Sequence, residues 1–297
     1  MATASVSTPT APAGIRRRLL AFVYRHRSLQ ALLLLTPPLG WFGVVYLGSL
    51  AVLFVAAFWY LDPLTSAIKH DFTLRNFQQL IGSPVYRQIA LRTLGIAAVV
   101  TLTDIILAFP LAYYMARHAG ARLRGVVLML VLLPLWSSYL VRVFAWRVLL
   151  SPGGPVESIL PGVKLYLTDT AMWIVFSYIW LPYMILPIYA GLERIPSSML
   201  EASSDLGARG LMTFRRIVLP LALPAVAAGS IFTFSLTLGD YITPQLVANS
   251  QFIGNVVFDN QGVAGNVPFA AAFATVPVLI MAIYLLVARR LGAFEAL

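Results

Sequence analysis

The 297-residue sequence has no cysteine, and only 11% of its residues are charged. Without cysteine the chain can form no disulfide, thiolate nucleophile or cysteine metal site. Its three histidines, His26, His70 and His118, have no metal-ligand spacing. The sequence contains no G-x-x-x-x-G-K-[ST] phosphate loop and no serine, histidine and aspartate arrangement. We therefore expect no catalytic residue, no metal and no cofactor, and nothing supports a membrane enzyme.

Apolar residues dominate the composition. The sequence is 60% hydrophobic with a mean hydropathy of +0.84, whereas about a quarter of the residues of a soluble domain are charged. The net charge of +10 would suggest nucleic acid in a soluble protein, but here it indicates arginines that fix membrane topology. We expect a polytopic membrane protein with lipid contacts and no nucleic-acid partner. The first apolar run is too long for a cleavable signal peptide.

The apolar runs predict six transmembrane helices, because a helix needs about 20 apolar residues to cross a bilayer. They lie at 31–61, 94–116, 125–149, 172–192, 221–239 and 268–288. Proline inside these runs predicts kinks, at Pro110, Pro134, Pro182, Pro187 and Pro277. The fold class is therefore all-α.

The arginines give the orientation. Most basic residues fall on one side if the N-terminus is cytoplasmic, which agrees with both termini inside. The expected organisation is a cytoplasmic tail (1–28), a first helix with an extracytoplasmic loop (29–90), a core of five helices (91–290) and a cytoplasmic tail (291–297). The polar loop 193–219 then lies in the cytoplasm.

This loop is built to fold. Ser198 and Glu201 fit a capping box after Pro196, and Gly207 stands where a left-handed helix end is expected. A second short helix is predicted at 211–218, ending before Pro220.

The second helix carries an apolar stripe of Leu211, Phe214 and Val218, with Arg215 beside it. A helix pair with one apolar and one charged face can dock into a groove on a soluble partner. It can equally lie on lipid headgroups, and the physical pattern alone leaves both open.

A resemblance to a known family favours docking on a protein partner over lying on lipid headgroups. The segment EASSDLG (201–207), followed by IVLP (217–220), resembles the EAA loop of ABC-importer permeases, except that Ser203 replaces the second alanine. The resemblance implies a type I ABC-importer permease fold and a helix that fits a cleft on a cytoplasmic ATPase. It implies coupling roles for Glu201, Ala202, Ser203, Asp205, Leu206, Gly207, Leu211, Phe214 and Arg215.

Further segments resemble the spermidine/putrescine importer permeases, including 72–80, 92–117, 133–150, 181–195 and 238–246. The resemblance covers about residues 30–290 and implies polyamine import in a bacterial plasma (inner) membrane. Permeases for iron, sulfate, thiamine and amino-acid-like solutes share much of the pattern. The implied partners are a second homologous permease, two cytoplasmic ATPase subunits and an extracytoplasmic substrate-binding protein.

Polar and aromatic residues in the spans are candidates for the cargo pathway or gate: Asp104, Trp136, Tyr139, Trp180, Tyr183 and Asp240. A carboxylate and aromatic faces suit a cationic cargo. The alternatives are local pairing of Asp104 with Thr101, Thr103 or an arginine, and interface packing for the aromatic residues. A stand-alone transporter or channel is the rival function. No inverted repeat is apparent in the sequence and carboxylates are few.

Overall fold

The computed structural model describes residues 27–290 as two units, divided between Val55 and Ala56. In the first unit, helix α2 (Arg27–Trp41) leads into the π-helical turn η1 (Phe42–Leu47) and helix α3 (Gly48–Ala56). Gln30–Ala56 is long and apolar enough to cross a membrane, as predicted. The tails 1–26 and 291–297, predicted to be cytoplasmic, lie outside the described residues.

The second unit begins with a small polar module. Strands β1 (Tyr60–Leu61) and β2 (Ile68–Lys69) form an antiparallel hairpin, and helix α4 (Arg75–Gly82) follows. Lys69 lies 2.8 Å from Asp62 across the turn, and its hydrogen bond holds the pKa of Asp62 near 2, below the ordinary 3.8. This compact unit begins at Ala56.

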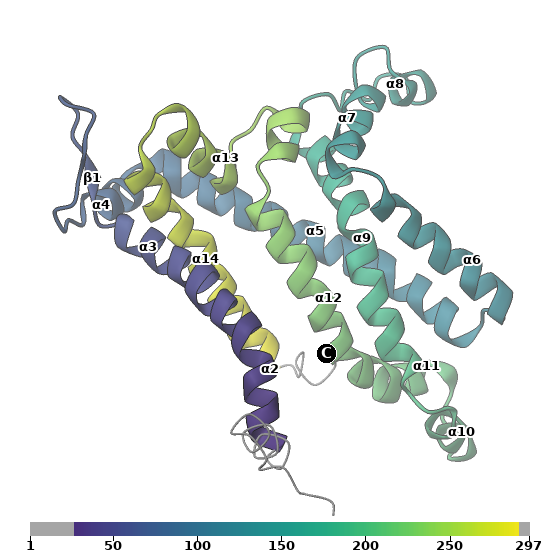
Figure 1. The fold of residues 1–297 in the computed structure, drawn as a ribbon. Helices are drawn as coiled ribbons and strands as arrows, with labels where there is room; N and C mark the ends of the chain where they lie inside the picture. Colours follow the sequence, from purple (N-terminus) through teal and green to yellow (C-terminus); the bar gives the residue numbers. More distant parts are fainter. Residues whose placement is uncertain (1–26, 291–297) are drawn as a thin grey trace, which may run out of the picture. The chain divides into compact units, whose positions relative to one another are not determined.

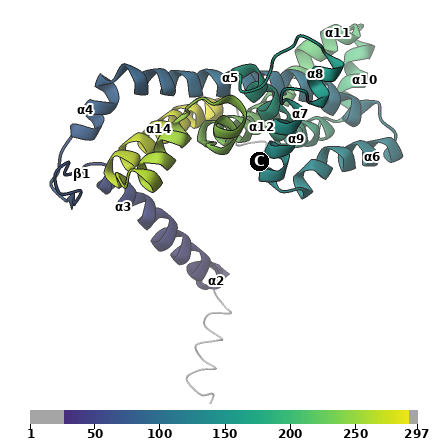
Figure 2. The same cartoon turned by 90° about the horizontal axis from the view of Figure 1, so that it is seen from above.

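Three long helices form the centre of this unit: α5 (Pro84–Arg117), α9 (Asp169–Glu193) and α12 (Leu219–Gly239). Figures 1 and 2 show them side by side. Small residues permit close approach, because a Cβ on Gly191 of α9 would lie 2.3 Å from the Ala225 Cβ of α12. Met184, Ile185 and Ile188 of α9 are buried in the resulting core.

The outer elements complete the unit. Helix α14 (Val267–Arg290) packs on α5 and α12 through apolar clusters. Between α12 and α14 lie the π-helical turn η4 (Pro244–Ala248), helix α13 (Ile253–Phe258) and the π-helical turn η5 (Asp259–Val263). The short helix α8 (Pro155–Ile159) precedes α9. Helices α5, α9 and α14 confirm three predicted spans, each somewhat longer than the apolar run.

The third predicted span, 125–149, is broken. Helix α6 (Ala121–Leu132) and the 3₁₀ turn η2 (Leu133–Trp136) meet helix α7 (Tyr139–Leu149) at 94°. Pro134 has no N–H to continue the helix, and Ser137 and Ser138 adopt extended backbone angles. The described residues therefore hold five straight candidate spans, or six when the bent pair counts as one.

The fifth span starts earlier than predicted. Helix α11 (Gly210–Thr213), the π-helical turn η3 (Phe214–Val218) and α12 form one continuous span, Gly210–Gly239. The prediction that a separate helix ends before Pro220 is therefore wrong. Pro220 has no N–H to donate to a carbonyl one turn earlier. The π-helical turn just before it already interrupts the regular i to i−4 hydrogen bonds, so the helix can continue through Pro220.

Candidate functional site

The segment 196–218, called here the coupling segment, connects α9 to α12. Its first helix is α10 (Ser197–Asp205). The predicted capping box is wrong, because α10 starts one residue before Ser198 and its N-cap, Pro196, has no side-chain hydrogen bond. Pro196 has the backbone angles of an N-cap, and the fixed φ of proline suits the entry to a helix.

Gly207 ends α10 as predicted. Its φ of +75° is left-handed. The Gly207 N–H donates to the Ser204 carbonyl at 2.9 Å, and the Ala208 N–H donates to the Ser203 carbonyl at 3.0 Å. These two bonds form a Schellman motif, which satisfies the last carbonyls of the helix.

Ser203 forms a hydrogen bond that links α10 to α11, the two helices of the coupling segment. Its side chain is buried, and its hydroxyl lies 2.8 Å from the Thr213 hydroxyl. An alanine at this position could not make that hydrogen bond. Ser203 is the residue that differs from the EAA pattern, and its hydrogen-bond partner lies ten residues later in the chain. The EAA motif alone does not predict this hydrogen bond.

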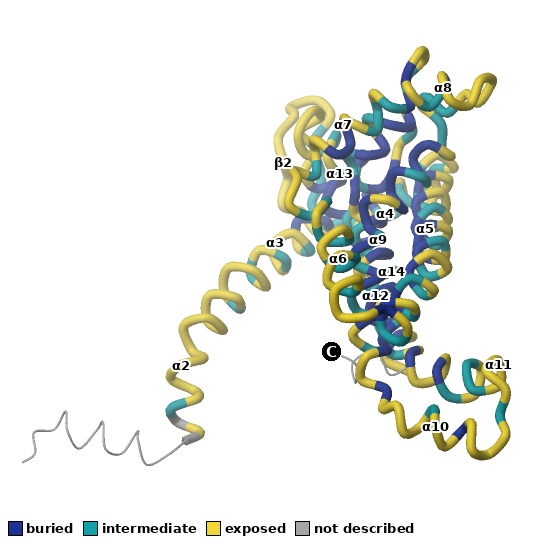
Figure 3. Tube along the Cα trace, turned by 90° about the vertical axis from the view of Figure 1, so that its right-hand side faces the viewer, coloured by how far each residue is buried: buried dark blue, intermediate teal, exposed yellow. Residues whose placement is uncertain are grey.

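Figure 3 shows that much of the coupling segment is exposed, and part of this exposed surface is apolar. Leu206 is 88% exposed and Leu211 is 70% exposed. The charged side chains of Glu201, Asp205 and Arg215 and the methyl of Ala202 are exposed as well.

A pocket of about 690 Å³ lies on this segment, lined in part by Met199, Met212 and Leu206. The two methionines are missing from the predicted residues. Their exposure, 47% each, and the adaptability of methionine at binding surfaces would have singled them out.

The three residues of the predicted apolar stripe differ in exposure to solvent. Leu211 is exposed, but Phe214 is half-buried and Val218 is buried in the core of this unit. Phe214 lies edge-on to Phe109 and Tyr113 of α5, with ring centroids 5.7 and 5.9 Å apart. Phe214 and Val218 therefore face the chain itself, and Leu211 is left as the outward apolar contact of the stripe.

A second cluster joins α7, α9 and the end of α12. Four of the six residues predicted for the pathway meet there: Tyr139, Trp180, Tyr183 and Asp240. The Tyr139 ring stacks on Trp180 at 5.7 Å, and Trp180 lies 5.9 Å from the Tyr183 ring. We call this group the aromatic–carboxylate cluster.

Asp240 anchors this cluster. The Tyr139 hydroxyl donates a hydrogen bond to its carboxylate. The Ile242 N–H donates to it at 2.8 Å and the Thr243 hydroxyl at 3.0 Å. Asp240 follows directly after α12 and is buried. Its hydrogen bonds therefore hold the Asp240 carboxyl group and the Tyr139 side chain in a fixed arrangement.

Two predicted pathway residues lie apart from this cluster. Trp136 in η2 is 80% exposed and makes no ring contact with the cluster in the described part of the chain. Asp104 in α5 is 0% exposed, and the polar side chain that its carboxyl group faces is that of Ser177 in α9. The hydroxyls of Thr101 and Thr103 bond to backbone carbonyls instead, so the predicted local pairing with them does not form.

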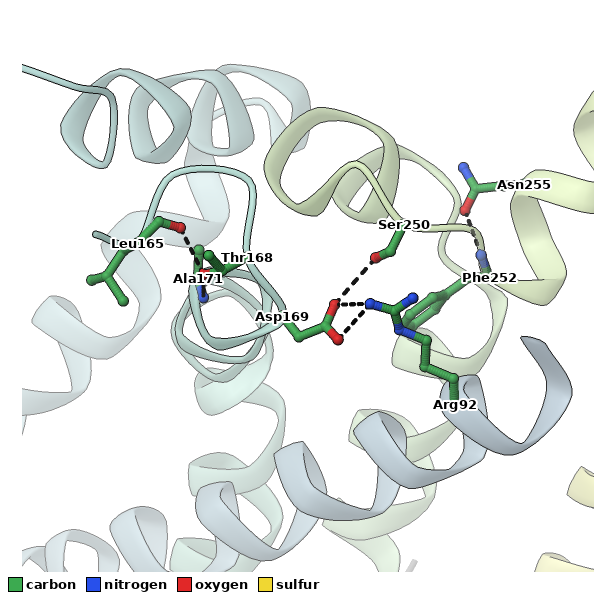
Figure 4. Close-up of polar contacts among 8 residues, drawn as sticks. All are labelled: Arg92, Leu165, Thr168, Asp169, Ala171, Ser250, Phe252 and Asn255. Atoms are coloured by element: carbon green, nitrogen blue, oxygen red, sulfur yellow. Dashed lines mark hydrogen bonds and ion pairs between the residues drawn. The ribbon is translucent and has the colours of Figure 1, made fainter. Parts of the chain in front are cut away.

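A third polar group joins the N-terminal ends of α5 and α9 (Figure 4). Arg92 of α5 forms an ion pair with Asp169, the first residue of α9. Ser250 donates to the same carboxylate at 3.3 Å. The Thr168 hydroxyl caps α9 by accepting from the Ala171 N–H at 3.1 Å. Polar contacts from three segments thus meet at this end of the helix bundle.

Comparison with known proteins identifies the family. A family model described as "Binding-protein-dependent transport system inner membrane component" matches residues 108–294. The chain is 47% identical over 295 residues to the inner membrane ABC transporter permease protein YdcU of Escherichia coli (strain K12), covering 93% of this chain and 94% of that protein. It is 31% identical over 231 residues to the spermidine/putrescine transport system permease protein PotB of the same strain, covering 75% and 83%.

Solved structures share the fold. A chain of a bacterial ABC transporter involved in the import of the acidic polysaccharide alginate matches with a TM-score of 0.71 at 18% identity, over 93% of this chain and 98% of that chain. A chain of the MetNI methionine ABC transporter in an inward-facing conformation matches with a TM-score of 0.56 at 18% identity, over 72% and 99%. At this identity the likeness establishes the all-α importer fold alone.

Proposed function

The chain belongs to the family of binding-protein-dependent transport system inner membrane components and is thus a permease subunit of an ABC importer; we propose that its cargo is a polyamine such as spermidine or putrescine. The observation that carries this proposal is the aromatic–carboxylate cluster. The name of the relative at 31% identity, a spermidine/putrescine permease, supports it.

The chemistry of the cluster fits a polyamine. Such a molecule is an extended apolar chain with ammonium groups, and an aromatic face attracts an ammonium by about 0.5–2 kcal/mol. The rings of Tyr139 and Tyr183 are half-buried, so part of each is accessible. Asp240 accepts a hydrogen bond from the Tyr139 hydroxyl and so fixes that ring beside Trp180.

The coupling segment is proposed to dock on a cytoplasmic ATPase. This role places both chain termini in the cytoplasm and the Arg92–Asp169 end of the bundle outside. The exposed apolar side chains of Leu206 and Leu211 suit a groove on such a partner. ATP hydrolysis belongs to that partner, and we expect none from this chain alone.

The full importer would contain this chain, a second homologous permease, two ATPase subunits and an extracytoplasmic binding protein. One solved relative, the alginate transporter, forms a complex with an alginate-bound periplasmic protein. Closure of the ATPases would move the coupling segments and switch the side to which the pathway opens.

Uptake by the complete complex tests the cargo. We expect ATP-dependent accumulation of labelled putrescine or spermidine in vesicles, with unlabelled polyamine competing and with sulfate, iron and thiamine not competing. Uptake of one of those solutes without polyamine competition would refute the cargo assignment.

Two tyrosines on α9 test the site. Tyr183→Leu should raise the KM for polyamine, whereas Tyr183→Phe should preserve it because the ring face remains. Tyr178→Leu on the same helix is the matched control, since Tyr178 packs on Trp146 outside the cluster. An equal KM for the Tyr183→Leu and Tyr178→Leu variants would refute the role of the cluster.

A further inference from the structure

The last residue of α5, Arg117, holds the end of a different helix. Its Nη2 donates to the Leu192 carbonyl at 2.7 Å and to the Ile195 carbonyl at 2.8 Å. Leu192 lies in the last turn of α9, and Ile195 stands just before the coupling segment. Carbonyls at a helix C-terminus need outside donors, and a cation there also meets the negative end of the helix dipole. Arg117 therefore fixes the point at which the chain enters the coupling segment.

The exit of the coupling segment is held by the same helix. Phe214 lies edge-on to Phe109 and Tyr113, an arrangement that aromatic rings favour. Phe109, Tyr113 and Arg117 follow each other at intervals of four residues, and such residues share one face of a helix. One face of α5 thus contacts both ends of the coupling segment, through Arg117 at the entry and through Phe109 and Tyr113 at the exit.

Between these two attachments, Leu200 of α10 packs against the core of this unit, and hydrogen bonds within the segment join its two helices. The Schellman motif at Gly207 and the bond between Ser203 and Thr213 join its two helices, while Leu206 and Leu211 project outward. A displacement of the segment as one body would therefore be transmitted through its two ends and through the Leu200 contact.

We propose that α5 is the helix that receives the movement of the coupling segment, and that Arg117 is the positioning residue that transmits it at the entry. This inference rests on the proposed docking of the segment on the ATPase. The N-terminal half of α5 carries Arg92, which pairs with Asp169 of α9. A tilt of α5 would therefore also act on this ion pair.

The test uses the complete complex in proteoliposomes, with cargo uptake and ATP hydrolysis measured together. Arg117→Gln should lower the cargo transported per ATP by about five-fold or more relative to wild type, because the neutral side chain no longer holds both carbonyls with a charge-assisted bond. Arg117→Lys should stay within about two-fold, since an ammonium has enough donors for both carbonyls. Arg122→Gln, at an exposed position of α6, is the matched control and should match wild type. A wild-type ratio for Arg117→Gln at normal membrane levels would overturn the inference.

A second measurement is independent of whether the Arg117 variants fold. The chain has no cysteine of its own, so spin labels can be placed at Ser204→Cys in α10 and at Tyr114→Cys, an exposed position in the last turn of α5. The inference expects the same distance between the labels in nucleotide-free and ATP-bound complexes, because α5 and the segment move together. A distance that changes between these states would overturn it.

Failure of this inference can be told apart from failure of the proposed coupling. If the segment does not dock on the ATPase, Glu201→Lys and Arg117→Gln should both keep the wild-type ratio, and both ideas fall. If only the role of α5 is wrong, Glu201→Lys should lower the ratio while Arg117→Gln leaves it unchanged.

Discussion

Replacing Gly207 separates the backbone conformation of the coupling segment from its side-chain contacts. A Cβ added at Gly207 would meet nothing within 4 Å, yet φ there is +75°. A left-handed conformation costs an L-residue about 1–2 kcal/mol, and less for asparagine. Such a cost lowers the population of the native turn by about 5- to 30-fold.

The loss of this turn would release α10. Both bonds of the Schellman motif depend on it, and with them the orientation of Leu206 relative to Leu211. ATP-driven uptake and the stimulation of ATP hydrolysis by loaded binding protein should therefore fall in the order wild type, Gly207→Asn, Gly207→Ala, Gly207→Val. Immunoblots of membranes should show equal amounts of all four proteins, because the turn is exposed and lies outside the packed core.

Gly210 supplies the matched control. It lies three residues further on, also has open space where a Cβ would be added, and lacks the left-handed φ. Gly210→Ala should leave uptake unchanged. If Gly207→Val transports as well as Gly210→Ala, the left-handed turn is not needed for coupling and the reasoning is refuted.

Three further predictions concern packing and hydrogen bonds. Gly191→Ala should lower the thermal unfolding temperature of the purified complex, with a cost of about 1–3 kcal/mol for overpacking, and Ala225→Gly should restore most of it; no drop would contradict the close approach of the helices. Ser203→Ala and Thr213→Ala should each weaken uptake slightly, and a double-mutant cycle should show a coupling of about 0.5–1.5 kcal/mol in stability; strict additivity would mean that the hydroxyls do not interact. Tyr139→Phe keeps the ring but loses the hydroxyl, so the KM for polyamine should rise by less than for Tyr139→Leu, and equal effects would exclude a role for the ring.

The membrane helices could be predicted because burial in a bilayer leaves a long apolar run in the sequence. The span 172–192 illustrates this, since the observed helix, Asp169–Glu193, extends it by only a few residues at the ends. Those end residues are decided by caps such as Thr168, which hydropathy does not detect.

Long-range contacts could not be predicted from one sequence. Gly207 was correctly predicted because its conformation depends on the residue itself. The pairing of Ser203 with Thr213, and the burial of Phe214 against α5, depend on how separate helices pack. The continuation of α12 through Pro220 was missed for a related reason, since a π-helical turn depends on packing more than on any one residue type.

The sequence predicted the residues of the aromatic–carboxylate cluster but not that they lie together. Residue type alone selected Tyr139, Trp180, Tyr183 and Asp240, but their convergence follows from the break before α7, which turns Tyr139 toward α9. Asp104 was selected for the same reason and lies sealed between helices.

The break between α6 and α7 also restricts which side of this chain can meet lipid. The first N–H groups of α7 have no intrahelical acceptors, and no side chain caps them. Hydrocarbon offers no acceptor either, so irregular backbone at membrane depth must lie against protein or water. Around this break Leu140, Val141 and Phe144 are exposed. At membrane depth that surface would have to lie against a neighbouring subunit or an aqueous passage.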